Sequence, residues 1–200
     1  MPRTLSIIRD EHRTITAILH GMEYLVHEVR THRKKVDPKV FHAMLYYLDT
    51  FAQRVHHPKE DKYLFGLMKA RSEEGARVIA VLEAEHAAGE ESLRRLAQAM
   101  IRYEEGGEKE LAGFERAVGN FVDGYRNHMR REEEELFPLA LGLLTPLDWV
   151  MVDAAMEEHT DPLAAAREEE NFDRLFDHIV RIAPPPIGIG PSVAQPTPTH

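Results

Sequence analysis

One ten-residue pattern occurs twice in the chain, and this repeat constrains the fold more than any other feature. The first copy begins at His56 and the second at His128, 72 positions later, and both read HxxxExxxLF. Glu60 and Glu132, and the Leu-Phe pairs after them, keep the same offset of 72. Residues four apart lie on one face of an α-helix. Each copy therefore predicts a helix that presents a His and a Glu side by side.

A lone histidine precedes each copy, at His12 and His86, which lie 44 and 42 positions before the histidine of the motif. An acid four positions after a His is weak evidence by itself, because 12 histidines and 34 acidic residues produce it about twice by chance. The shared offset is what exceeds chance. It predicts a two-helix unit used twice, so that four helices face one another with four His and two Glu.

Apolar residues recur at steps of three and four over four long stretches, which predicts amphipathic helices. Asp37-Pro38 and Ser72 are helix-start signals, and Gly106-Gly107 is a stop signal. Short loops imply antiparallel neighbours, so we expect an all-α, up-down-up-down four-helix bundle. Pro58 lies inside the second helix and predicts a bend there. The expected bundle spans residues 1–142, with helices over residues 5–30, 38–70, 72–105 and 108–141.

Two further helices are expected after the bundle. Thr145 and Asp148 resemble a capping box, which predicts a short helix to about Glu158, and Asp161-Pro162 begins another to about Ile182. We interpret residues 143–183 as a C-terminal helical extension packed on the bundle. Residues 184–200 form a Pro-rich tail that cannot build a core and is expected to be extended or disordered.

Composition limits the class of protein. The chain has no cysteine, which excludes disulfides, thiolate zinc sites and iron–sulfur clusters. Its formal net charge of −9 argues against a nucleic-acid partner, whereas small neutral ligands and cations are not repelled. No apolar stretch approaches the ~18 residues of a membrane span, and residues 1–10 lack the apolar segment of a signal peptide. We expect a cytoplasmic monomer or homodimer without a membrane partner.

The repeated residues suit metal binding. Imidazole with carboxylate favours a first-row transition metal. Six ligands exceed the four of a closed zinc site but fit two metals about 3.5–4 Å apart that share both carboxylates. Positions then remain open for an oxo or hydroxo bridge and for an exogenous ligand. The predicted ligands are His12 with His56 on one metal, His86 with His128 on the other, and Glu60 and Glu132 as bridges.

The order His12, His56xxxGlu60, His86, His128xxxGlu132 resembles the bacterial type of the hemerythrin-like (HHE cation-binding) family, over about residues 4–142. The resemblance implies a four-helix bundle with a non-haem di-iron centre, although the ligand types also suit manganese or zinc. It implies binding of, or reaction with, dioxygen, peroxide or nitric oxide, as in oxygen or redox sensing or catalase-like peroxide removal. The alternative is a non-enzymatic module that stores iron or oxygen, or that regulates through its metal-dependent fold.

The chain departs from the oxygen carriers of that family at one position. Those proteins have a fifth histidine one turn after the third-helix histidine, where this chain has Glu90, and Thr16 stands at the equivalent place in the first half. The departure argues against reversible oxygen carriage. Glu90 is either an additional ligand or a solvated acid. Ferritin-like chemistry is disfavoured because only Glu83 precedes a predicted ligand with the Glu-x-x-His spacing.

A structural bundle without metal is the third hypothesis, since any one of these histidines could be a hydrogen-bonded core residue. Two buried carboxylates without a cation would however cost several kcal/mol each. His159 lies 73 positions after His86 but has no HxxxE after it, which favours a surface residue. His57 is interpreted as a surface histidine or a support behind the ligands. Tyr125 either packs near the metals or fills the core, and core filling is the favoured interpretation.

Overall fold

The computed structural model describes residues 1–32, 35–158 and 162–191, and every regular element within these ranges is a helix. The first helix, α1 (Arg3–His32), buries an apolar stripe that includes Ile8, Ile15 and Leu19. His12 lies within this stripe and is 3% exposed. The all-α prediction is confirmed over the described part of the chain, and no helix in it is long and apolar enough to cross a membrane.

The second arm of the bundle is helical throughout but changes its winding near the first HxxxE motif. The side chain of Asp37 accepts a hydrogen bond from the Lys39 amide and caps the start of the arm, where Pro38 occupies the first turn. Pro58 has no amide hydrogen to continue a regular ladder, and wide π-helical turns flank it. The segments are α2 (Pro38–Tyr47), η1 (Leu48–His56), α3 (His57–Lys59), η2 (Glu60–Phe65) and α4 (Gly66–Arg71).

The third and fourth arms begin and end near the positions that the sequence signals indicate. The hydroxyl of Ser72 accepts from the amides of Glu74 and Gly75 and caps α5 (Glu73–Gly106). Gly107, with φ of 61°, ends that helix in a conformation that favours glycine. The fourth arm comprises α6 (Glu108–Arg131), η3 (Glu132–Leu136) and α7 (Phe137–Leu143).

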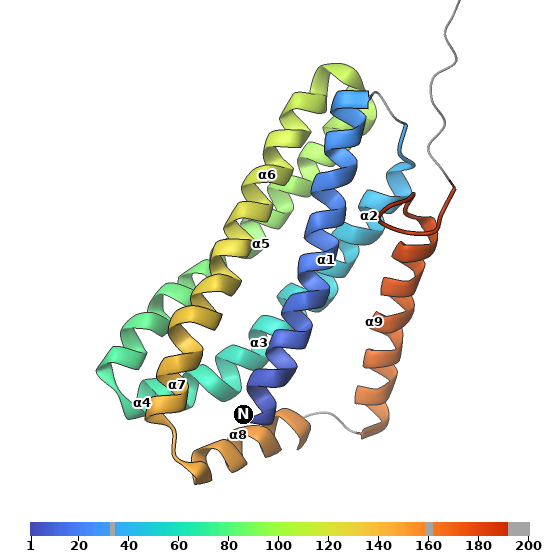
Figure 1. Ribbon diagram of the computed structural model, residues 1–200. Coiled ribbons are helices and arrows are strands. Elements are labelled where there is room, and N and C mark those ends of the chain that lie inside the picture. Colours follow the sequence, from blue (N-terminus) through green and yellow to red (C-terminus); the bar gives the residue numbers. More distant parts are fainter. Residues whose placement is uncertain (33–34, 159–161, 192–200) are drawn as a thin grey trace, which may run out of the picture.

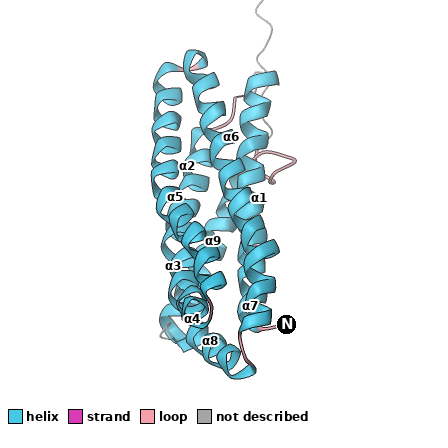
Figure 2. Cartoon of the chain, turned by 90° about the vertical axis from the view of Figure 1, so that its left-hand side faces the viewer, coloured by secondary structure: helices cyan, strands magenta, loops and turns pink. Residues whose placement is uncertain are grey.

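The four arms lie side by side as a bundle (Figures 1 and 2). α6 packs against both α5 and α1, and η1 contacts α1 and α5. The alternating up-down direction of the arms stays a prediction. Two buried apolar clusters fill the interior, and the repeated His and Glu positions fall between them on all four arms. On α1, for example, Ile8 belongs to one cluster and Ile15 to the other, with His12 between them.

The C-terminal segments pack on this bundle. Thr145 and Asp148 form the predicted capping box, with the Thr145 amide donating to Asp148 Oδ2 at 2.9 Å and the Asp148 amide donating to the Thr145 hydroxyl at 3.2 Å. α8 (Pro146–Glu158) contacts α1 and η2 at the end of the bundle where the N-terminus lies (Figure 1), and Trp149 packs on the nearer apolar cluster.

The last helix, α9 (Pro162–Ile182), runs beside α2. Residues 184–191, the described part of the Pro-rich segment, turn back on this helix. The Ile189 amide donates to the Val180 carbonyl and the Gly190 amide to the Ala183 carbonyl. Ile187 packs against the larger apolar cluster near Gly21. The remaining tail residues, 192–200, lie outside the described residues.

Candidate metal centre

Each of the four predicted histidines makes the same kind of contact on the side facing away from the centre. Its Nδ1 atom lies 2.7 to 3.0 Å from a carboxylate oxygen. A carboxylate that accepts the Nδ1 hydrogen fixes the tautomer and leaves the Nε2 lone pair free for a metal. The pairs are His12 with Glu133, His56 with Glu11, His86 with Asp61 and His128 with Glu85.

These outer carboxylates follow the internal repeat, although the sequence analysis did not give them this role. Glu85 follows Glu11 by 74 positions, and Glu133 follows Asp61 by 72. Glu11 and Glu85 each contact a histidine of their own half, whereas Asp61 and Glu133 each contact a histidine of the other half. The signal that could have identified them is an acid directly before each lone His and directly after each motif Glu.

Glu60 and Glu132 lie among the four Nε2 atoms. Oε2 of Glu60 is 3.7 Å from Nε2 of both His56 and His86. Oε2 of Glu132 is 3.1 Å from His12 Nε2, while its Oε1 is 3.4 Å from His128 Nε2. Each carboxylate therefore reaches one histidine of each half of the chain.

Both carboxylates are buried without conventional partners. Glu60 and Glu132 are 1% and 0% exposed, and none of their four oxygens has a hydrogen-bond partner in the described chain. The 3.1 Å contact of Glu132 with His12 becomes a hydrogen bond only when the His12 ring carries hydrogens on both nitrogens, because a neutral imidazole that donates from Nδ1 has none on Nε2. Buried polar atoms nearly always have a partner. A cation among these atoms would supply it.

The charges within the cluster are mutually dependent. Burial and the neighbouring Glu132 raise the pKa of Glu60 well above its ordinary value, which favours the protonated form of this carboxyl in the metal-free protein. Burial would also raise the pKa of Glu132, but the imidazoles of His128, His12 and His86 outweigh it and hold that pKa well below the ordinary range. Burial lowers the pKa of His86, yet Asp61 and Glu132 raise it to about 9.

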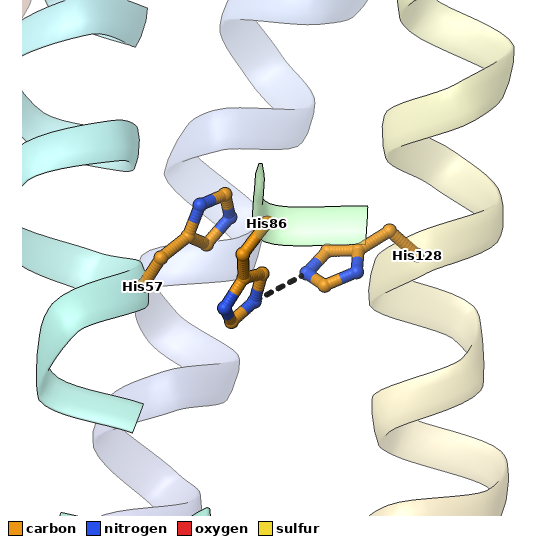
Figure 3. A group of neighbouring side chains, drawn as sticks. All are labelled: His57, His86 and His128. Carbon is orange, nitrogen blue, oxygen red and sulfur yellow. Dashed lines mark hydrogen bonds between the residues drawn. The ribbon is translucent and has the colours of Figure 1, made fainter. Parts of the chain in front are cut away.

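The spacing of the donor atoms fits two metal ions. Figure 3 shows the hydrogen bond between His86 and His128, whose Nε2 atoms are 3.1 Å apart; a metal would displace the hydrogen that they share. Two nitrogens bound at right angles to one metal at about 2.0–2.1 Å would be about 3 Å apart. Two groups of buried donors, each within 4.8 Å, share both carboxylates: His12, His56, Glu60 and Glu132, and Glu60, His86, His128 and Glu132.

The phenylalanines of the repeated motif support the histidine rings. Phe65 stacks on His86 with ring centroids 5.6 Å apart, and Phe137 stacks on His12 at 6.3 Å. Each motif Phe thus contacts the lone histidine of the other half. This contact gives a structural reason for the Leu-Phe pair in both copies, because an apolar ring excludes water and limits rotation of the imidazole.

Two further buried residues join the cluster: His57, for which the sequence left a surface position or a support behind the ligands open, and Tyr125, for which core packing was expected. His57 is 4% exposed and stacks on His86 with ring centroids 4.0 Å apart. The Tyr125 hydroxyl lies 2.8 Å from His57 Nε2. Burial and the imidazoles of His86 and His56 hold the pKa of His57 far below its ordinary value, so its ring is neutral. Burial and the charges of Glu60 and Glu132 raise the pKa of Tyr125 well above 10.

Glu90, the suggested additional ligand, is exposed on α5 and belongs to none of the donor groups in the described chain. Thr16, at the equivalent position on α1, is also exposed and lines two surface cavities beside His12. His159 lies outside the described residues. The structure therefore brings together the six repeated residues and not Glu90.

Surface cavities reach both halves of the cluster. A cavity of about 560 Å³ between α5 and α6 is lined by His128, Tyr125 and His57. On the other side, a cavity of about 270 Å³ between α1 and α6 is lined by His12 and Met129. Small molecules can therefore approach a site whose ligand atoms are otherwise buried.

Comparison with known proteins agrees with this description of the site. The model of one protein family, described as the hemerythrin HHE cation-binding domain, matches residues 3–140. No curated protein and no solved structure matches the chain. The matched range contains all six repeated residues and all four outer carboxylates, and it ends before α8 begins.

Removing one outer carboxylate should weaken metal binding without removing a ligand. We predict that Glu11→Gln lowers metal affinity about 10–100-fold, because His56 loses the anion that orients and polarises its ring. The measurement is competition with a chelator of known affinity. Glu104→Gln is the matched control, since Glu104 contacts the exposed His42 at 2.9 Å in a His–Glu pair that takes no part in the cluster. Equal affinities of the two variants would contradict the role of Glu11.

Metal binding near neutral pH should release protons. The pKa of His86 is raised to about 9, so this ring carries an extra proton near pH 7 in the metal-free protein, and the raised pKa of Glu60 favours protonation of that carboxyl as well. Ligation displaces these protons, so apparent affinity should increase as the pH rises from 7 towards 9. Titration calorimetry in buffers of different ionisation enthalpy measures the release. Identical heats in every buffer would contradict it.

Proposed function

Because the chain belongs to the hemerythrin family of HHE cation-binding domains, we propose that it holds two iron ions and that the loaded site binds or reacts with dioxygen, peroxide or nitric oxide. The ligands would be the six repeated residues, with two histidines for each ion and the two glutamates shared. They are His12 and His56, His86 and His128, and Glu60 and Glu132.

One observation carries the proposal. All four histidines contact outer carboxylates through Nδ1, so that four Nε2 atoms face two buried carboxylates whose oxygens have no other partner in the described chain. A purely structural cluster would satisfy these oxygens with donors, because an unpaired buried charge costs several kcal/mol. Two cations shared by both carboxylates would satisfy every one of these atoms together.

The donor set supports a redox-active metal with unfilled positions. Imidazole nitrogen and carboxylate oxygen suit iron and other first-row transition metals. Each half offers two imidazoles and a share of two carboxylates, which leaves room for an exogenous ligand on an ion that accepts six. When bound, iron would supply the electron-transfer chemistry, while the protein orients the imidazoles and limits the access of water.

Access from the surface favours a reactive site over simple storage. The larger cavity reaches His128, and a separate one reaches His12, so a diatomic ligand or peroxide has a route to either half. A non-enzymatic storage or regulatory module remains the alternative function. It predicts bound iron that does not respond to any of these ligands.

Metal content and spectroscopy test the proposal together. Protein loaded anaerobically with ferrous iron should hold about two irons per chain and should change its optical spectrum on addition of dioxygen, peroxide or nitric oxide. His128→Ala should lose at least one iron and most of the response, because one half keeps a single histidine. His42→Ala is the control, since His42 is exposed and its contact with Glu104 lies outside the cluster.

The outcomes separate the hypotheses. A wild-type protein that binds no iron, or the same iron content in His128→Ala and wild type, would contradict the proposed site. Two irons without any spectral response would support the storage or regulatory module instead of the reactive one.

A further inference from the structure

The two halves of the cluster differ at two buried positions, although the ligands repeat. The repeat places Met129 at the position equivalent to His57, and Tyr125 at the position equivalent to Gln53, each pair being 72 residues apart. Met129 lines the cavity beside His12, whereas His57 and Tyr125 line the cavity beside His128. One half therefore has a thioether next to it, and the other has an imidazole hydrogen-bonded to a phenol.

His57 is poorly placed to ligate the metal that His86 would hold. Its ring lies 11° from parallel to the His86 ring, with the centroids 4.0 Å apart, and Figure 3 shows the two rings close together beside His128. The lone pair of an imidazole nitrogen lies in the ring plane, so a metal sits in the plane of each ring that binds it. Two stacked, nearly parallel rings do not share such a metal. His57 Nε2 is in addition engaged with Tyr125.

The Tyr125–His57 pair has one hydrogen-bond donor more than it uses. A phenol and a neutral imidazole carry one polar hydrogen each, and a single hydrogen bond joins them. If the phenol donates to Nε2, the hydrogen on Nδ1 is left, and Nδ1 has no partner in the described chain. If Nε2 donates instead, the phenol hydrogen is left. In either arrangement an unused donor is buried beside His86 and His128.

The cavity between α5 and α6 leads to this pair. Its volume of about 560 Å³ is roughly twice that of the cavity beside His12. Gly124 lines it, and a Cβ at this position would meet no atom within 4 Å. The glycine therefore keeps open space next to Tyr125.

We propose that a small ligand with lone-pair oxygen or nitrogen atoms enters through this cavity, binds at the His86/His128 half, and accepts a hydrogen bond from the Tyr125–His57 pair. This inference rests on the proposed function and adds to it the half at which the ligand binds and the residues that select it. At the His12/His56 half the equivalent position holds Met129, whose thioether donates no hydrogen bond, and the donors that line its cavity, on Thr16, Arg126 and Arg130, are not buried.

Azide is a suitable probe, because it is a small anion with terminal nitrogen acceptors. We expect Tyr125→Phe to keep the iron content of the wild type and to bind azide about tenfold more weakly, measured by optical titration of the iron-loaded, oxidised protein. His57→Gln should likewise keep both metals and weaken azide binding.

Two variants serve as controls. Tyr103→Phe removes a hydroxyl from a ring that stacks on Phe114 outside the cluster, and Met129→Leu changes the equivalent position of the other half. Both controls should bind azide as the wild type does.

The entry route has its own test. Gly124→Leu should slow azide association in stopped-flow measurements, since the added side chain would project into the cavity. Gly119→Leu is the matched control on the same helix, because a Cβ there also meets no atom within 4 Å and the residue does not line the cavity. Equal association rates in the two variants would overturn the route.

Three results would overturn the rest of the inference. Unchanged azide affinity in Tyr125→Phe would show that the Tyr125–His57 pair makes no hydrogen bond to the ligand. Loss of a metal in His57→Gln would show that His57 is itself a metal ligand. Weaker azide binding in Met129→Leu would place the ligand at the other half. A wild-type chain without metal would instead contradict the proposed function, and with it this inference, so the two failures are distinguishable by metal content.

Discussion

The structure depends on how the negative charge of two buried carboxylates is compensated. Glu60 and Glu132 lie between two apolar clusters, where an unpaired negative charge costs several kcal/mol. The surrounding imidazoles balance only part of this charge in the metal-free protein, which lowers the pKa of Glu132 and raises that of Glu60. Four more acids orient the imidazoles from outside, so the cluster contains more negative than positive groups. Such an arrangement is stable when cations occupy its centre, and this requirement links the fold of the bundle to metal binding.

The internal repeat explains most of the geometry and also shows where the two halves differ. Two of the outer carboxylates, Asp61 and Glu133, and both motif phenylalanines connect one half to the histidines of the other, so neither half completes its site alone. The exchange of His57 for Met129 between equivalent positions then makes two otherwise similar groups of donors chemically different. If each group holds an ion, as we propose, the two ions need not react alike.

The sequence predicted the features that depend on local spacing. Each of these features depends only on the spacing of residues within a single helix. They are the HxxxE copies, the lone histidines and the caps at Ser72 and Thr145, and the structure agrees with them. Residues whose role depends on packing between helices were harder to predict. His57 directly follows His56, and on a regular α-helix it would face well away from the ligand; here α3 is a short segment between two π-helical ones, η1 and η2, and the His57 ring stacks on His86 of α5. Glu90 has suitable chemistry and spacing, yet its side chain lies on the exposed face of α5.

The central claim is that two metal ions share Glu60 and Glu132. Anomalous diffraction at the iron absorption edge, on crystals of the iron-loaded protein, measures this directly. We expect two peaks about 3.5–4 Å apart between these carboxylates, each next to two of the four histidine Nε2 atoms. A single peak, or iron bound only at surface acids, would contradict it.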